Sequence, residues 1–160
     1  MHTPEALLDI HERSQRNLEK LLAHCRPFGV DEVNRSLEGF GYPTIRLQLH
    51  HEISAQEYWL SVLHGRMVAE ETEHLYPTIE SLEAYRTRVA GAIADYLRGA
   101  SAAELNTARP MTTWGGGVKS LMPAHVILRT LTHLYHHQGQ VVAMCRLLGK
   151  PTSGLDFPLL

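Results

Sequence analysis

The chain has 160 residues, of which 44% are hydrophobic and 20% are charged, and this composition is typical of one globular domain and excludes disorder as the main state. The net charge of −2 leaves no basic surface for nucleic acid or an anionic membrane, and two cysteines are too few for a disulfide framework or a cysteine-rich zinc site. The first residues lack a basic-then-apolar signal pattern, and no apolar run approaches the roughly 18 residues of a membrane span, so we expect a cytoplasmic protein without a membrane span.

The first half of the chain contains two long segments with helical periodicity. Thr3 and Pro4 are typical of a helix start, and the apolar spacing that follows predicts a helix over about residues 3–24. A short helical turn is expected over 31–38, and a second long helix over about 43–64, where a glycine follows.

The second long helix is apolar on two sides. Leu49 and Ile53 fall on one side, whereas His51 and Tyr58 fall on another at about 100° per residue. A helix with two apolar faces is buried on both, so we expect one face to meet the core and the other to meet a second subunit or loops.

The second half of the chain begins with a third periodic segment, predicted as a helix over 78–99. A helical turn is expected over 101–105, and the threonine- and glycine-rich residues 106–119 predict a hairpin or extended loop. The last helix is predicted over about 123–148, and the tail 152–160 is expected to be irregular.

Four long helices in a chain of this size predict an all-α fold, a four-helix bundle. The chain contains no repeat and no linker that would divide it, so we expect a single domain over residues 1–160. The connection between the second and third long helices has roughly a dozen residues, which is long enough for a crossover.

Histidine is the outlying residue type, with 11 in the chain. His133 and His137 lie one helical turn apart, so their imidazoles can reach a single cation, although such a pair is also the pattern of two surface histidines. His136 is within one turn of His133 as well. His51 adds a third imidazole on an inward face, and three imidazoles with an open position form a catalytic type of zinc site.

Other aromatic, cysteine, acidic and histidine residues are interpreted as packing or surface residues rather than as ligands. Trp114 either covers a pocket or packs, Cys145 is a small buried residue, and Glu57 lies on the wrong side of His51 for a ligand or base. Six histidines are expected at the surface or at helix ends: His2, His11, His24, His64, His74 and His125.

Two stretches resemble the signature sequences of the DinB/YfiT-like metalloenzyme superfamily. They are residues 49–60, and residues 133–140, which match the H-x-x-H-H-R-G-Q pattern with Gln138 where arginine is usual. Residues 114–120 resemble a loop that precedes the last helix in these proteins, and the ending 147–151 is also similar. The resemblance covers almost the whole chain and implies a four-helix bundle in up-down-down-up order.

The resemblance also implies one divalent transition metal, Zn, Ni, Fe or Mn, held by three histidines. Carried over residue by residue, the ligands are His51, His133 and His137, and His136 becomes a neighbour. Because this chain has Gln138 where arginine is usual, any role that the arginine has in the family is left open here. Members are often dimers, so we expect a homodimer that uses the second apolar face of the second helix.

Three functions are compatible with such a site, whose open positions acidify a bound thiol or water. The resemblance favours an enzyme of the thiol S-transferase type, in which a low-molecular-weight thiol attacks a small-molecule substrate, because relatives include thiol transferases and a mycothiol-dependent isomerase. A hydrolase that uses metal-bound water is an alternative, but the sequence shows no convincing carboxylate base. A non-catalytic, stress-related metal-binding bundle is the third. For thiol transfer, Arg46 and Arg129 are candidates for holding a carboxylate-bearing thiol near the pocket mouth, because they lie on the metal-bearing helices.

Overall fold

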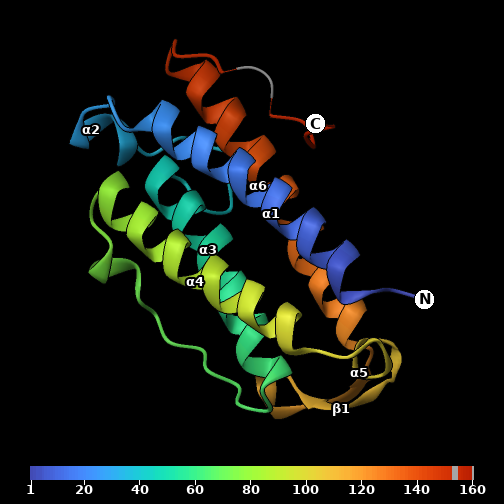
Figure 1. Cartoon of the computed structure of the whole chain (residues 1–160). Coiled ribbons are helices and arrows are strands. Elements are labelled where there is room, and N and C mark those ends of the chain that lie inside the picture. The colour runs from blue at the N-terminus through green and yellow to red at the C-terminus, as the bar shows by residue number, and fades with distance from the viewer. Residues whose placement is uncertain (153–154, 160) are drawn as a thin grey trace.

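Long helices dominate the structure, a computed structural model that describes residues 1–152 and 155–159. Four of them pack side by side (Figure 1): α1 (Pro4–Cys25), α3 (Ile45–Leu63), α4 (Ile79–Gly99) and α6 (Pro123–Leu147). Each bound lies within two residues of the predicted one. The mostly helical class is therefore confirmed.

Threonine side chains define the start of three long helices. Thr3, Thr44 and Thr78 have extended backbones, and each hydroxyl accepts a hydrogen bond from the backbone N–H three residues later, at 3.1–3.2 Å. The helix α6 instead begins with Pro123, whose missing N–H costs nothing in the first turn. These bonds are local, which explains why the sequence predicts the helix starts well.

The shorter elements depart from the predictions in two places. They are α2 (Val30–Val33), η1 (Glu73–Leu75), α5 (Ala102–Asn106), β1 (Arg109–Thr112), η2 (Trp114–Gly116) and β2 (Val118–Leu121). The predicted helix over 31–38 is too long, because the chain leaves the helix at Asn34, whose Nδ2 donates to the carbonyl of Val30. The strands β1 and β2 pair antiparallel, which confirms the hairpin alternative predicted for residues 106–119, with β2 continuing to Leu121. This hairpin is a small sheet that the all-α class does not include.

The helix α3 lies between α6 and α4, and α1 contacts α4 and α6 on the other side of the bundle. The core between them is built mainly from leucine and isoleucine, including Leu18, Leu22, Leu49, Ile53, Leu82, Leu97 and Leu134. The side of α3 that carries Leu49 and Ile53 is thus buried within the chain. The side that carries Leu47 and Tyr58 lines a cavity of the same chain. Both apolar faces are accounted for without a second subunit, and the homodimer stays a prediction.

The connection from α3 to α4 runs along the outside of these two helices (Figure 1). Arg46 holds it in place, because its guanidinium donates to the carbonyls of Glu73 (2.9 Å) and Tyr76 (3.4 Å). Residues 155–159 form neither helix nor strand, as predicted, and 153, 154 and 160 of the predicted tail lie outside the described residues. Within the described part of the chain, no helix has both the length and the apolar character needed to cross a bilayer.

Candidate metal centre

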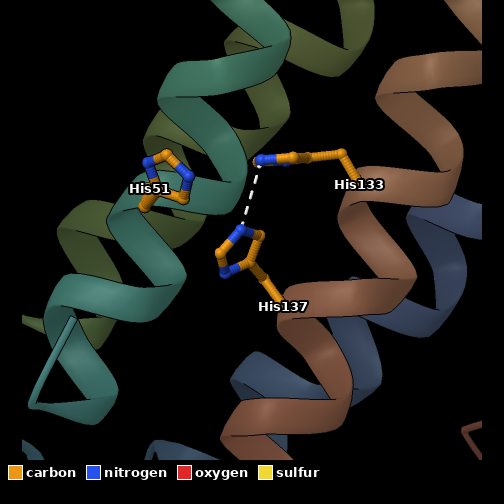
Figure 2. Close-up of side chains that lie close together, drawn as sticks. All are labelled: His51, His133 and His137. Atoms are coloured by element: carbon orange, nitrogen blue, oxygen red, sulfur yellow. Dashed lines mark hydrogen bonds between the residues drawn. The ribbon is translucent and has the colours of Figure 1, made fainter. Parts of the chain in front are cut away.

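The packing of α3 against α6 brings three imidazole rings together (Figure 2). The ring centroids of His133 and His137 are 4.4 Å apart, and the ring of His51 lies 4.5 Å from His137 and 5.0 Å from His133. One nitrogen from each ring lies within 4.8 Å of the other two. The three predicted residues are thus neighbours in space, and their role as metal ligands stays a prediction.

The spacing of the nitrogens fits a small divalent ion. The Nε2 atoms of His133 and His137 are 3.2 Å apart. Two imidazole nitrogens that bind one tetrahedral zinc ion at about 2.0–2.1 Å are separated by roughly 3.3 Å. A modest movement of the His51 ring would complete such a set.

The electrostatics of the cluster keep the imidazoles uncharged. Burial, reinforced by the neighbouring histidines, lowers the pKa of His51 to about 4 and that of His137 to about 3. Burial also lowers the pKa of His133, with the Arg129 guanidinium adding to the effect. All three rings are therefore neutral at pH 7, which is the form that binds a metal.

Gln48 orients the ring of His137. The Nδ1–H of His137 donates to Gln48 Oε1 at 2.8 Å, so in the neutral ring the lone pair of Nε2 faces the other two histidines. Gln48 Nε2 donates to Gln140 Oε1 (2.6 Å), and Gln140 Nε2 donates to His136 Nε2 (3.1 Å). Exposed His136 thus ends a hydrogen-bond chain behind His137 and is not part of the three-ring cluster.

Tyr42 covers the outer face of the cluster. Its ring stacks on His51 with a centroid separation of 4.1 Å and an interplanar angle of 22°. Tyr42 lies in the loop before α3, which is outside any motif, and sequence reasoning missed both this residue and Gln48. A signal for Gln48 was present: it lies three residues before His51 and so shares its side of the helix.

A cavity of about 860 Å³ opens beside the cluster. Its lining includes His51 and His133, residues 68–73 of the connection, and Trp59 and Trp114. Arg129 lines it, as the carboxylate-holding role requires. Arg46 does not line it, because its guanidinium binds the connection.

Glu57 lines the same cavity, but its carboxylate is already engaged. Arg88 donates to it at 2.6 Å, and the Tyr85 hydroxyl donates to its other oxygen at 2.6 Å. Burial raises the pKa of Glu57, but these hydrogen bonds outweigh burial and hold the pKa below its usual value. A carboxylate held in this way is a weak proton acceptor, consistent with the prediction that Glu57 is neither ligand nor base.

The other residues singled out in the sequence lie outside the histidine cluster. His11 is buried and its Nε2 bonds to the carbonyl of Ala90, so its expected place at the surface is wrong. His125 is exposed and away from the cluster. Cys145 is buried beside Cys25, with the sulfurs 3.9 Å apart. Gln138 Nε2 donates to the carbonyl of Leu155, which ties the tail to α6.

Comparison with known proteins supports this picture. A model of the DinB superfamily matches residues 12–141. The chain belongs to the DinB superfamily. The solved structure of a conserved protein from Enterococcus faecalis is similar, with a TM-score of 0.68 over 94% of this chain and 99% of that chain, at 15% identity. At that identity the likeness shows the fold alone.

No curated protein matches the sequence. The family and the geometry together give a coarse conclusion: this DinB-superfamily protein has three clustered histidines that are compatible with binding a divalent metal.

Proposed function

We propose that His51, His133 and His137 hold one divalent transition metal, and that the protein is an enzyme of the thiol S-transferase type acting on a small-molecule substrate. The observation that carries the proposal is the position of the cluster, since three neutral imidazoles lie together and two of them, those of His51 and His133, line a cavity large enough for a substrate. When bound there, a divalent ion supplies Lewis acidity that lowers the pKa of a coordinated low-molecular-weight thiol.

The residues of the chain prepare the site for that chemistry. Gln48 holds His137 in one tautomer, and Tyr42 restricts the ring of His51. Because the three ligands are neutral, they leave the full charge of the ion available to a bound anion such as a thiolate. His51 and His133 line the cavity, whereas a structural metal would be four-coordinate and closed.

The hydrolase alternative is weaker because of Glu57. Metal-dependent hydrolysis normally uses a carboxylate that accepts a proton near the attacking water. The carboxylate of Glu57 is paired with Arg88 and Tyr85 instead, and its pKa lies below the usual value. A thiol depends less on such a base, because its pKa of about 8.5 is far below that of water, and a metal-bound thiol would release its proton to solvent.

We also propose the up-down-down-up order of the four long helices. The colour gradient in Figure 1 supports it, because α1 and α6 run in one direction and α3 and α4 run in the other. Two helices of like direction need a long connection, and the residues between α3 and α4 supply it.

Elemental analysis of purified variants tests the metal site. We expect the wild type and His136→Ala to retain about one metal per chain, and His51→Ala, His133→Ala and His137→Ala to lose it. His136→Ala is the matched control, because it removes a neighbouring imidazole from the same helix. Metal retained in His137→Ala would show that the ligand assignment is wrong.

A thiol-consumption assay tests the activity. A low-molecular-weight thiol and a small electrophile are mixed with the metal-loaded protein, and the loss of free thiol is followed. We expect turnover that a chelator abolishes and added metal restores. Chelator-sensitive hydrolysis of an ester without any thiol would favour the hydrolase, and no turnover of either kind would favour the non-catalytic bundle.

A further inference from the structure

The cavity has a cluster of three aromatic side chains in its wall. Both tryptophans of the chain, Trp59 and Trp114, line it, together with Tyr58 between them. The ring of Tyr58 lies 5.1 Å from that of Trp59 and 6.3 Å from that of Trp114. The Tyr58 hydroxyl also accepts a hydrogen bond from the backbone N–H of Trp114 (2.6 Å), which fixes the β1–β2 loop at the cavity rim.

Trp114 is 74% exposed in spite of its size. An indole held at a rim, with its face open to solvent, provides a large apolar contact at low entropic cost to a flat ligand that enters beside it.

Arg129 lines the cavity beside this aromatic cluster. Its guanidinium carbon lies 5.4 Å from the ring centroid of Trp59. Stacking uses the flat face of the guanidinium and leaves its in-plane N–H donors available. Among the residues that the structure describes, the side chain of Arg129 makes no hydrogen bond and no ion pair.

The other cation of the cavity differs in this respect. Arg88 is paired with Glu57 at 2.6 Å, so its charge is already neutralised. Four glutamates, Glu57, Glu70, Glu71 and Glu73, also line the cavity, and the carboxylate of Glu57 is paired with Arg88. Arg129 is the cavity-lining arginine whose charge no ion pair within the described residues neutralises.

Arg129 precedes His133 by four residues on α6, which places it one turn away, about 6 Å along the helix axis. A ligand anchored at Arg129 would therefore have its opposite end within reach of the histidine cluster. A planar carboxylate matches the guanidinium fork, since it accepts two parallel N–H bonds.

We propose that Arg129 binds the carboxylate of a flat aromatic carboxylic acid whose body packs against Trp59 and Trp114. The inference rests on the proposed function in one respect, namely that this acid is the substrate presented to the three histidines. It names the chemical class of that substrate, and the carboxylate site itself is testable without any metal.

The test uses 4-fluorobenzoate as the probe and 4-fluorobenzamide, its neutral analogue of the same shape. Binding is measured by ¹⁹F NMR on metal-free full-length protein, so that the carboxylate has no metal to bind. We expect the acid to bind at least tenfold more tightly than the amide, and Arg129→Gln to weaken the acid by about tenfold to hundredfold while leaving the amide unchanged. Arg129→Lys keeps the charge but loses the fork, so an intermediate affinity is expected.

Arg146→Gln is the matched control, because Arg146 is an exposed arginine of the same helix outside the cavity. Its affinity for the acid should equal that of the wild type. Equal binding of the acid and the amide to the wild type would overturn the proposal without any variant. Unchanged binding of the acid to folded Arg129→Gln would do the same.

Elemental analysis of the wild type as purified separates this inference from the proposed function. If the protein contains metal but binds the acid and the amide equally, the carboxylate site is refuted and the proposed function is not. If the protein contains no metal but binds the acid through Arg129, the metalloenzyme proposal is refuted and the carboxylate site is supported.

Discussion

Gln48→Leu tests whether the centre depends on a residue that is not itself a ligand. Gln48 is fully buried and accepts the Nδ1–H of His137 at 2.8 Å. Leucine fills a similar volume but offers no acceptor, and at 0% exposure water cannot replace the lost carbonyl. The ring of His137 then loses the bond that selects its tautomer, and its N–H is left without a partner.

The expected loss of zinc affinity is about tenfold to hundredfold. An unsatisfied buried donor costs about 1–3 kcal/mol, and each factor of ten in affinity corresponds to about 1.4 kcal/mol. The same range is typical when an acceptor behind a metal-binding histidine is removed. Affinity is measured by competition with a chromophoric chelator, and circular dichroism checks that the variant is folded.

Gln140→Leu is the control for this substitution. Gln140 is half-buried and contacts Gln48 but not His137, so its removal leaves the His137–Gln48 bond in place. We expect a loss of affinity below about threefold, because one neutral hydrogen bond to a partly solvated group contributes little. The reasoning is refuted if folded Gln48→Leu binds zinc as the wild type does, or if both substitutions weaken binding equally.

Three other predictions concern stability and assembly. In the metal-free folded protein the pKa of His51 is lowered to about 4 and that of His137 to about 3, whereas both are near 6.5 in the unfolded chain. The unfolded chain therefore binds more protons below pH 6.5, and the free energy of unfolding should fall as the pH drops from 6.5 toward 3. Between pH 7 and 5, Tm should fall less in the double variant His51→Gln, His137→Gln than in the wild type. Burial of Glu52, whose oxygens have no hydrogen-bond partner among the described residues, raises its pKa well above 4.5, so the fold disfavours the ionised carboxylate and loses stability as the pH rises from 4.5 toward neutral. Glu52→Gln should therefore raise Tm at pH 7, by an amount that shrinks toward pH 4.5, and an unchanged Tm at pH 7 would contradict this account. For the homodimer, light scattering at micromolar concentration should give twice the mass of the chain, and a species of single-chain mass would remove the prediction.

Much of the candidate site was predictable from sequence because two of its three histidines follow helical spacing. His133 and His137 are one turn apart, and the resemblance to the DinB family adds His51. The unpredicted parts depend on contacts between distant segments. Gln48 and His137 are 89 positions apart, and the pairing of Glu57 with Arg88 spans 31. No local pattern distinguishes a free glutamate from one that a neighbouring helix has already engaged.

The amino-acid sequence by itself determined where the long helices begin and end, since Thr3 and Thr78 make their capping bonds three residues away and apolar periodicity is a property of each segment alone. Only the tertiary structure decided which imidazoles meet. His136 and His137 are about 100° apart on α6, and the packing against α3 turns His137 toward His51 and leaves His136 exposed. It also separated Arg46, bound to the α3–α4 connection, from Arg129, whose guanidinium makes no hydrogen bond within the described residues. The physical reason is that the direction of a side chain follows from its helix, whereas its partner is determined by the neighbouring helix.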